Sequence, residues 1–313
     1  MNDRKIVKDG AILGAIFILL LIMTFFIPII SLISIFLLPV PLIIFAGRYG
    51  IKPSVIVLMI LSLISVILLS IFSLPLTFVM GLGGLAIGLA IYSKKEAYET
   101  WAQGTFSFAI GIATVYVLTQ FIFDVNWIHE LNVLIEDSLE STMTLFEQVG
   151  VQVSQEEFEV LQQSINDLMY LIPTGMVLIG LTLAFVSQWV GYKVINRLDS
   201  TQFKFPPFRE FRLPASIIWI FLLGIILTWI YTDPADTMYL AAANLYALPG
   251  VLLVLQGLSF VFYFTHYKNW SRALPVMTVI IFVLFPFLLI YPLRILGIID
   301  LGFQLRDRLS GKK

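Results

Sequence analysis

The sequence predicts an all-α membrane protein, a polytopic bundle of eight or nine transmembrane helices. The first observation is composition, since 59% of the 313 residues are hydrophobic and only 12% are charged. A soluble domain of this size carries about twice that charged fraction. The second is that the apolar residues form long uncharged runs, and about 20 such residues cross a bilayer as a helix. No barrel-like alternation is visible, so the spans are helices.

The first uncharged run extends from Ala11 to Ala46, which is too long for a signal-peptide core and for a single span. It predicts two short spans with a turn near Pro28 to Ser31. The next uncharged run, 53–93, is broken at Ser73-Leu74-Pro75 and predicts spans three and four. Further spans are expected over 101–123, 168–192, 213–232 and 237–265.

The last apolar segment, from 273 to about 299, is interrupted by Pro286, Pro292 and Arg294. A ninth full span would put the basic C-terminal tail outside, against the positive-inside rule. A re-entrant segment broken at its prolines would return the tail to the inside. The sequence is compatible with both arrangements.

The basic residues sort to one side of these spans, which predicts a cytoplasmic N-terminus. The opposite side has no Lys or Arg before residue 273. The residues that fall on the inner side are Arg4, Lys5, Lys8, Arg48, Lys52, Lys94, Lys95, Lys193, Arg197, Lys204, Arg209, Arg212, Lys268 and Arg272.

This organisation divides the chain into three parts. A six-span membrane module covers 1–192, a basic cytoplasmic loop covers 193–212, and a two- to three-span extension with a basic tail covers 213–313. The module includes an outer segment, 124–167, which carries half of the protein's 20 acidic residues and no Lys or Arg.

Helical periodicity in the outer segment predicts two amphipathic helices. The first ends at Gly150, and the second opens with a capping box of Ser154 and Glu157. The favoured interpretation is a solvated cover that anionic headgroups repel. The alternative is a lid over a ligand site, or a docking face for a cationic partner.

Motifs for catalysis are absent. The chain has no Cys, and it contains no phosphate-binding loop, no GxSxG and no HExxH. We therefore expect no enzyme activity, no cofactor, no metal and no nucleic-acid partner. The first eight spans contain no charged residue in their interiors, which argues against a proton-coupled pump.

Four polar residues within the spans are candidates for ligand binding or for hydrogen bonding between helices. Three are the amides Gln120, Asn244 and Gln256, and interhelical contact is the favoured role for them. The fourth is Arg294, the one candidate charge inside a hydrophobic segment. It is expected to pair with Asp300 or to extend toward the membrane surface.

Small residues recur four apart in the first span. Gly10 and Gly14 form one pair, and Ala11 and Ala15 form another on the adjacent face. Such residues let helices approach closely in lipid. Because the pattern begins at the cytoplasmic edge, where a partner subunit can reach it, these four residues are a hypothetical docking face. A second set in span four is expected to serve packing within the bundle: Gly81, Gly84 and Gly88.

Three stretches, "DGAILGAIF", "LPVPLIIFAGRYGIKPSV" and "LPLTFVMGLGGLAIGLAIYSKK", resemble the first four spans of the substrate-capture (S) subunits of energy-coupling-factor vitamin transporters. In that family an AxxxA motif of the first helix contacts the membrane coupling subunit, and Ala11 and Ala15 match that motif. The whole chain more closely resembles the YybS-like family of uncharacterised bacterial membrane proteins. The stretches "VLQGLSF" and "LGIIDLGFQLRDRL" carry that second likeness.

The S-subunit resemblance implies a membrane component that binds or transports a small molecule and depends on a separate ATPase. Its partners would be the lipid bilayer, a membrane coupling subunit and a small-molecule ligand. The alternative is a non-transporting membrane scaffold that recruits partners through its basic and acidic segments.

Overall fold

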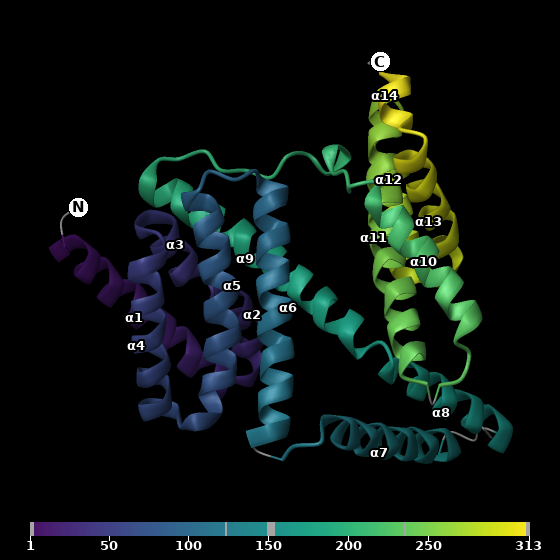
Figure 1. The fold of residues 1–313 in the computed structure, drawn as a ribbon, viewed down its shortest axis with the longest axis horizontal. Coiled ribbons are helices and arrows are strands. Elements are labelled where there is room, and N and C mark those ends of the chain that lie inside the picture. The colour runs from purple at the N-terminus through teal and green to yellow at the C-terminus, as the bar shows by residue number, and fades with distance from the viewer. Residues whose placement is uncertain (1–2, 123, 149–153, 235, 311–313) are drawn as a thin grey trace. The chain divides into compact units, whose positions relative to one another are not determined.

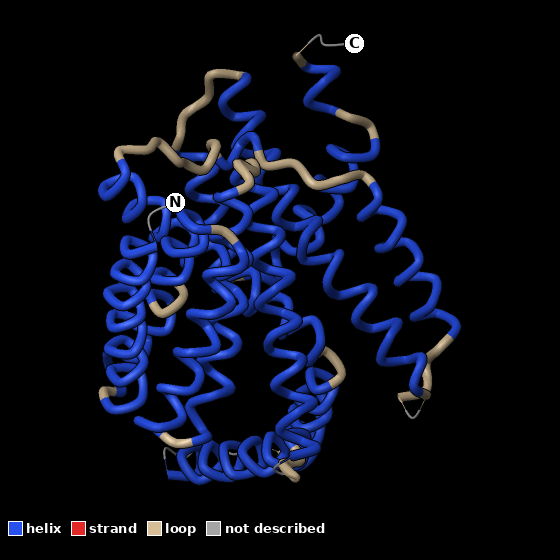
Figure 2. Tube along the Cα trace, turned by 60° about the vertical axis from the view of Figure 1, so that its left-hand side comes forward, coloured by secondary structure: helices blue, strands red, loops and turns tan. Residues whose placement is uncertain are grey.

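In the computed structural model of the chain, residues 3–122, 124–148, 154–234 and 236–310 are described. Their regular structure is entirely helical (Figure 2). The chain divides into two compact units (Figure 1). The first consists of Met1–Gln162 and Gly175–Phe205, and the second of Gln163–Thr174 and Pro206–Lys313.

The spans of the first unit follow the predicted order, and the described residues of the two units together contain seven helices that are long and apolar enough to cross a membrane. A break separates α1 from α2, which begins at Pro28. Ser70, which has a φ of +78°, ends α4 a few residues before the turn predicted at Ser73-Leu74-Pro75. The helices of the first unit are α1 (Asp3–Phe26), α2 (Pro28–Leu37), α3 (Val40–Tyr49), α4 (Ile51–Leu69), the 3₁₀ turn η1 (Ile71–Ser73), α5 (Leu74–Tyr92), α6 (Ala97–Ile122) and most of α9 (Ile172–Asp199).

Helix α5 lies at the centre of the first unit and packs against α3, α4 and α6. Its glycines make these close approaches possible. A Cβ at Gly84 would lie 2.6 Å from the carbonyl oxygen of Pro39, and one at Gly88 would lie 2.6 Å from that of Ile43. A Cβ at Gly81 would meet Leu58 of α4 at 2.2 Å. All three glycines of the predicted packing set therefore face neighbouring helices.

The outer segment forms two helices, α7 (Trp127–Gln148) and α8 (Gln155–Met169). Helix α7 lies crosswise to α6 (Figure 1), and Trp127 Nε1 donates to Thr119 Oγ1 at 2.7 Å. Helix α8 begins directly after Ser154. Gly150 and the side chain of Glu157 lie outside the described residues, so the predicted helix end and the partner in the capping box stay predictions.

The second unit contains α10 (Ser216–Ile230), α11 (Thr237–Tyr267), α12 (Ala273–Leu284), α13 (Pro286–Gly302) and α14 (Leu305–Leu309), with the 3₁₀ turn η2 (Phe208–Glu210). Helices α11 and α13 run parallel, because Gly250 faces Arg294, Leu253 faces Gly297 and Gln256 bonds to Asp300. A Cβ at Gly297 would lie 2.1 Å from the carbonyl oxygen of Leu253, so the backbones nearly touch.

Helices α12 and α13 of the last apolar segment pack against each other as a hairpin, which is the geometry that the re-entrant alternative requires. At about 1.5 Å per residue, the 12 residues of α12 cover only about 18 Å, less than the roughly 30 Å of a hydrocarbon core. The chain then turns at Phe285–Pro286 and returns through α13. Tyr263, near the end of α11, donates to the carbonyl of Arg306, so α14 lies at the end of the unit where α11 finishes.

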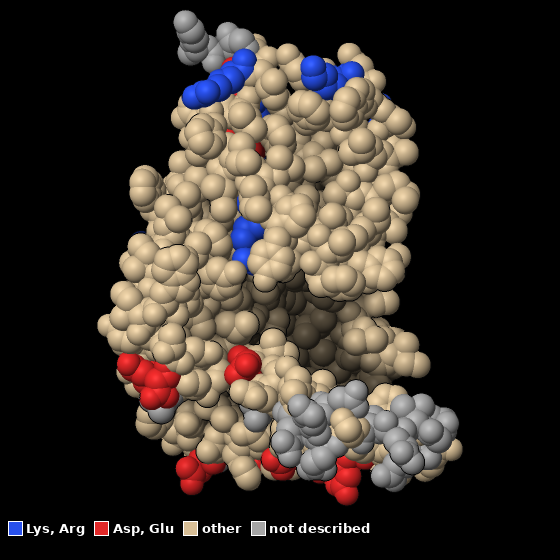
Figure 3. Space-filling view, turned by 90° about the vertical axis from the view of Figure 1, so that its right-hand side faces the viewer, with Lys and Arg blue, Asp and Glu red and all other residues tan. Residues whose placement is uncertain are grey.

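The surface between the helix ends is apolar. Most of the face in Figure 3 carries neither acidic nor basic side chains. Large hydrophobic side chains stay exposed within each unit, among them Ile29 and Phe121 at 83% and Trp229 at 79%. Such a surface is stable only against lipid.

Replacing Gly84 with Ala tests the central packing of α5. The added methyl would overlap a backbone carbonyl that cannot rotate away, and overpacking of this kind typically costs about 1–3 kcal/mol. We expect a clearly lower Tm in detergent. Gly175→Ala is the matched control, because nothing lies within 4 Å of a Cβ at that position. Equal Tm values for the two variants would contradict this packing.

Candidate functional site

The small residues of α1 differ in their surroundings, since the two glycines contact other helices and the two alanines are exposed. Gly14 is buried, and a Cβ there would lie 3.2 Å from Leu61 of α4; one at Gly10 would lie 3.3 Å from Phe45 of α3. Ala11 and Ala15, in contrast, are exposed. The glycines thus serve packing inside the unit, while the alanines leave an open surface beside them.

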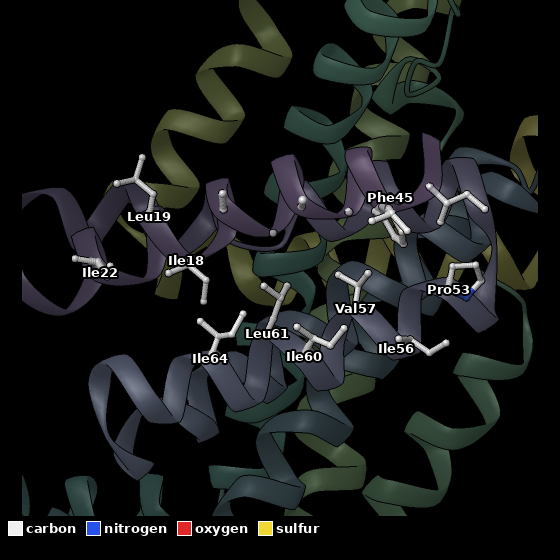
Figure 4. Close-up of a pocket in the computed structure, with 16 residues that line it drawn as sticks. Ile18, Leu19, Ile22, Phe45, Pro53, Ile56, Val57, Ile60, Leu61 and Ile64 are labelled. Atoms are coloured by element: carbon white, nitrogen blue, oxygen red, sulfur yellow. The ribbon is translucent and has the colours of Figure 1, made fainter. Parts of the chain in front are cut away.

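Ala11 and Ala15 line an apolar groove of about 850 Å³ between α1 and α4. Figure 4 shows Val57, Leu61 and Ile64 of α4 pointing toward α1 across it. Each residue that lines the groove is apolar: Ile6, Val7, Gly10, Ala11, Gly14, Ala15, Ile18, Leu19, Ile22, Phe45, Pro53, Ile56, Val57, Ile60, Leu61 and Ile64. The groove is suited to a hydrophobic occupant.

An ion-pair cluster fixes one end of α1. Asp9 accepts from Tyr49 Oη at 2.7 Å and from Arg48 Nη1 at 3.3 Å. Arg48 also binds Asp199 through two hydrogen bonds, of 2.9 Å from Nε and 2.6 Å from Nη2. Farther along α1, Phe17 and Leu21 are fully buried. These contacts hold α1 in place while its alanine face stays open.

The four polar candidates are not brought together. Gln120 is exposed on α6 of the first unit and makes no hydrogen bond to the described part of the chain. The other three belong to the second unit. Asn244 Oδ1 accepts from Thr174 N and Oγ1, and its Nδ2 donates to the carbonyls of Tyr170 and Leu240. Asn244 thus uses its full hydrogen-bonding capacity to hold the start of α9 against α11.

Gln256 belongs to a buried polar cluster that sequence reasoning did not find. Its Nε2 donates to Asp300 at 2.5 Å, and its Oε1 accepts from the backbone N–H of Leu213 at 2.9 Å. Asp300, only 1% exposed, pairs with Arg306, whose Nη2 lies 2.8 Å from Oδ2. Arg306 Nη1 also donates to the carbonyls of Arg209 and Phe211. The cluster joins α11, α13, α14 and the chain around η2.

The expected pairing of Arg294 with Asp300 is wrong. Residues six apart in a helix lie about 9 Å apart along the axis and about 120° apart around it. Asp300 is instead reached by Arg306, because the turn at Gln304, with a φ of +49°, folds α14 back. Arg294 is only 8% exposed and its Nη1 donates to Tyr246 Oη at 2.8 Å, so it does not extend to the membrane surface either.

Metal-binding groups are not gathered in the described residues, where no set of three or more His, Asp and Glu side chains could hold an ion.

Helices of this length and apolarity define an integral, multi-pass membrane protein. The chain belongs to the family described as "Predicted membrane protein (DUF2232)", whose profile matches residues 15–301. It is 26% identical over 311 residues to "Uncharacterized protein YybS" of Bacillus subtilis (strain 168), covering 99% of this chain and all of that one. The YybS-like resemblance is thereby confirmed. No solved structure matches the chain.

The buried cluster generates a stability prediction. Asp300→Ala leaves Arg306 buried without its carboxylate, and breaking such a pair typically costs about 3–5 kcal/mol. We expect a large fall in Tm, or loss of the folded protein. The matched control is Asp307→Ala, which breaks the half-exposed pair with Arg212 and should cost at most about 1 kcal/mol. A small effect of Asp300→Ala would show that the cluster does not hold the second unit together.

Proposed function

We propose that this protein is a membrane subunit that binds a small molecule for transport and has no ATPase of its own. A separate coupling complex in the bacterial plasma membrane would supply the energy, and α1, with its N-terminus in the cytoplasm, would be the docking helix. The observation that carries this proposal is the open apolar groove beside Ala11 and Ala15.

The occupant we assign to the groove is a transmembrane helix of the coupling subunit. Exposed alanines four apart form a flat strip against which a second helix can pack closely, and close backbone approach drives helix association in lipid. The ion pairs of Asp9 and Arg48 leave this strip fixed before a partner arrives, which lowers the ordering cost of binding. The resemblance of the first four spans to S subunits supports the same assignment.

The proposal requires no catalysis by the chain, and we infer that it is not an enzyme. Three of the polar groups inside the second unit make structural contacts: Asn244, Gln256 and Arg306. A binding subunit needs only a site and a docking surface.

A scaffold without transport activity is the second candidate. The charge distribution favours it: the segment 193–212 is rich in Lys and Arg, and the segment 124–167 has acidic residues without basic ones. Segments with an excess of one sign of charge at a membrane surface attract partners of the opposite sign.

The docking role is tested with the double variant Ala11→Leu, Ala15→Leu. The larger side chains would fill the groove, so we expect loss of the coupling partner at an unchanged Tm. The measurement is affinity purification of the full chain from its native membrane, followed by mass spectrometry of co-purifying subunits and retained small molecules. The matched control is Ile12→Phe, Ile16→Phe, which adds bulk to exposed positions of α1 outside the groove.

Three results are informative. Loss of an ATPase-containing complex in the alanine variant alone supports the proposal. Partners retained equally by both variants, with no small molecule bound, favour the scaffold. A groove that holds only lipid would show phospholipid in the wild type, less in the alanine variant, and no change in protein partners, which contradicts docking.

A further inference from the structure

Arg294 is a buried cation whose hydrogen-bonding capacity is mostly unused. A guanidinium has five N–H donors, and within the described residues only Nη1 donates, to Tyr246 Oη at 2.8 Å. The Nε atom is buried and has no partner. The side chain is only 8% exposed, so water does not surround the guanidinium as it would at a surface.

Among the described residues, no carboxylate forms an ion pair with Arg294. Asp300, the nearest acid along α13, is engaged by Arg306 and Gln256. Asp167 contributes to the wall of the pocket beside Arg294, but forms no ion pair with it. A buried cation in an apolar segment is costly unless it is paired. The missing counter-charge is therefore the unusual feature of this position.

The surroundings of Arg294 hold the guanidinium in place without accepting hydrogen bonds from most of its donors. The rings of Phe221, Tyr246 and Tyr291 have centroids 5.4, 5.2 and 5.6 Å from its Cζ, which gives cation–π attraction. Gly250 of α11 leaves the space that the guanidinium occupies, since a Cβ there would lie 3.1 Å from Cζ. The cation is fixed by contacts that use ring faces and leave most of its N–H donors unused among the described residues.

Arg294 also lines a pocket of about 620 Å³ within the second unit. The residues that line it include three with hydroxyl groups, Tyr170, Thr228 and Tyr239. They also include apolar residues, among them Ala247, Val251 and Ile290. A pocket with a cation, a few hydroxyls and an apolar wall has the character of a ligand site.

We propose that this pocket binds an amphiphilic anion, a phosphate or carboxylate group attached to an apolar chain. The oxyanion would accept hydrogen bonds from the guanidinium, whose planar donors match phosphate and carboxylate geometry. The apolar chain would lie along Ala247 and Ile290. The ligand is either an anionic phospholipid or a free amphiphile. This inference goes beyond the proposed function and does not depend on docking at α1.

The test uses the full chain purified in a neutral detergent and three probes: phosphatidylglycerol, phosphatidylcholine and decyl phosphate. Binding of each is measured by native mass spectrometry for the wild type, Arg294→Gln and Arg308→Gln. The last is the matched control, because it removes one positive charge from an exposed position of the same unit. We expect Arg294→Gln to weaken binding of the anionic probes at least about tenfold, and Arg308→Gln to leave it unchanged.

The probes distinguish the two sources of the anion. An Arg294-dependent preference for phosphatidylglycerol over phosphatidylcholine identifies a lipid headgroup site. Arg294-dependent binding of decyl phosphate alone identifies a free amphiphile. Equal affinities of the wild type and Arg294→Gln for both anionic probes overturn the proposal.

A second variant keeps the test decisive if Arg294→Gln does not fold. Ala247→Phe narrows the pocket and leaves the cation in place, so it should also weaken binding of the anionic probes. Unchanged binding in a folded Ala247→Phe variant would place the anion elsewhere and refute this site. Partner co-purification with Ala247→Phe should match the wild type, so failure at this pocket and failure at the α1 groove can be told apart.

Discussion

Lipid as the surrounding solvent is the constraint on which the rest of the structure depends. Hydrocarbon offers backbone N–H and C=O groups no hydrogen bonds, so each span must be a helix. It also removes the hydrophobic drive between helices, since lipid tails are as apolar as Leu and Ile. Cohesion then comes from two devices that this chain uses repeatedly: glycines such as Gly84 and Gly297 that bring backbones together, and buried polar side chains such as Asn244 and Gln256.

The two devices have different consequences for function. The glycines of α1 face α3 and α4 and contribute to packing within the unit. The alanines beside them are not covered and leave an open surface. Polar groups show the same contrast. Asn244, Gln256 and Arg306 have partners for their hydrogen-bonding groups within the second unit, whereas Arg294 has one partner and an adjacent pocket. In both cases the candidate site is the feature whose contacts within its own unit are incomplete, the alanine face of α1 in one unit and Arg294 in the other.

Much of the architecture was predictable, because uncharged runs and the breaks between them are properties of the chain alone. Helices α10 and α11 differ from the predicted spans by only a few residues. The buried cluster was not predictable, since Asp300 and Arg306 lie at a segment end where charges are ordinary. Their burial depends on the turn at Gln304 and on carbonyls from the distant η2 region. The partner of Arg294 was not predictable either, because Tyr246 lies on α11 and reaches Arg294 only through the packing of α11 against α13.

The hairpin of α12 and α13 also bears on how the protein is made. In the re-entrant arrangement, a helix of 12 residues that turns back does not carry its following segment through the hydrocarbon. In that arrangement the basic residues Arg306 and Arg308 are spared translocation during biosynthesis. A reporter fused after α14 would emerge on the face where α11 ends, although a simple count of apolar segments assigns it to the opposite one.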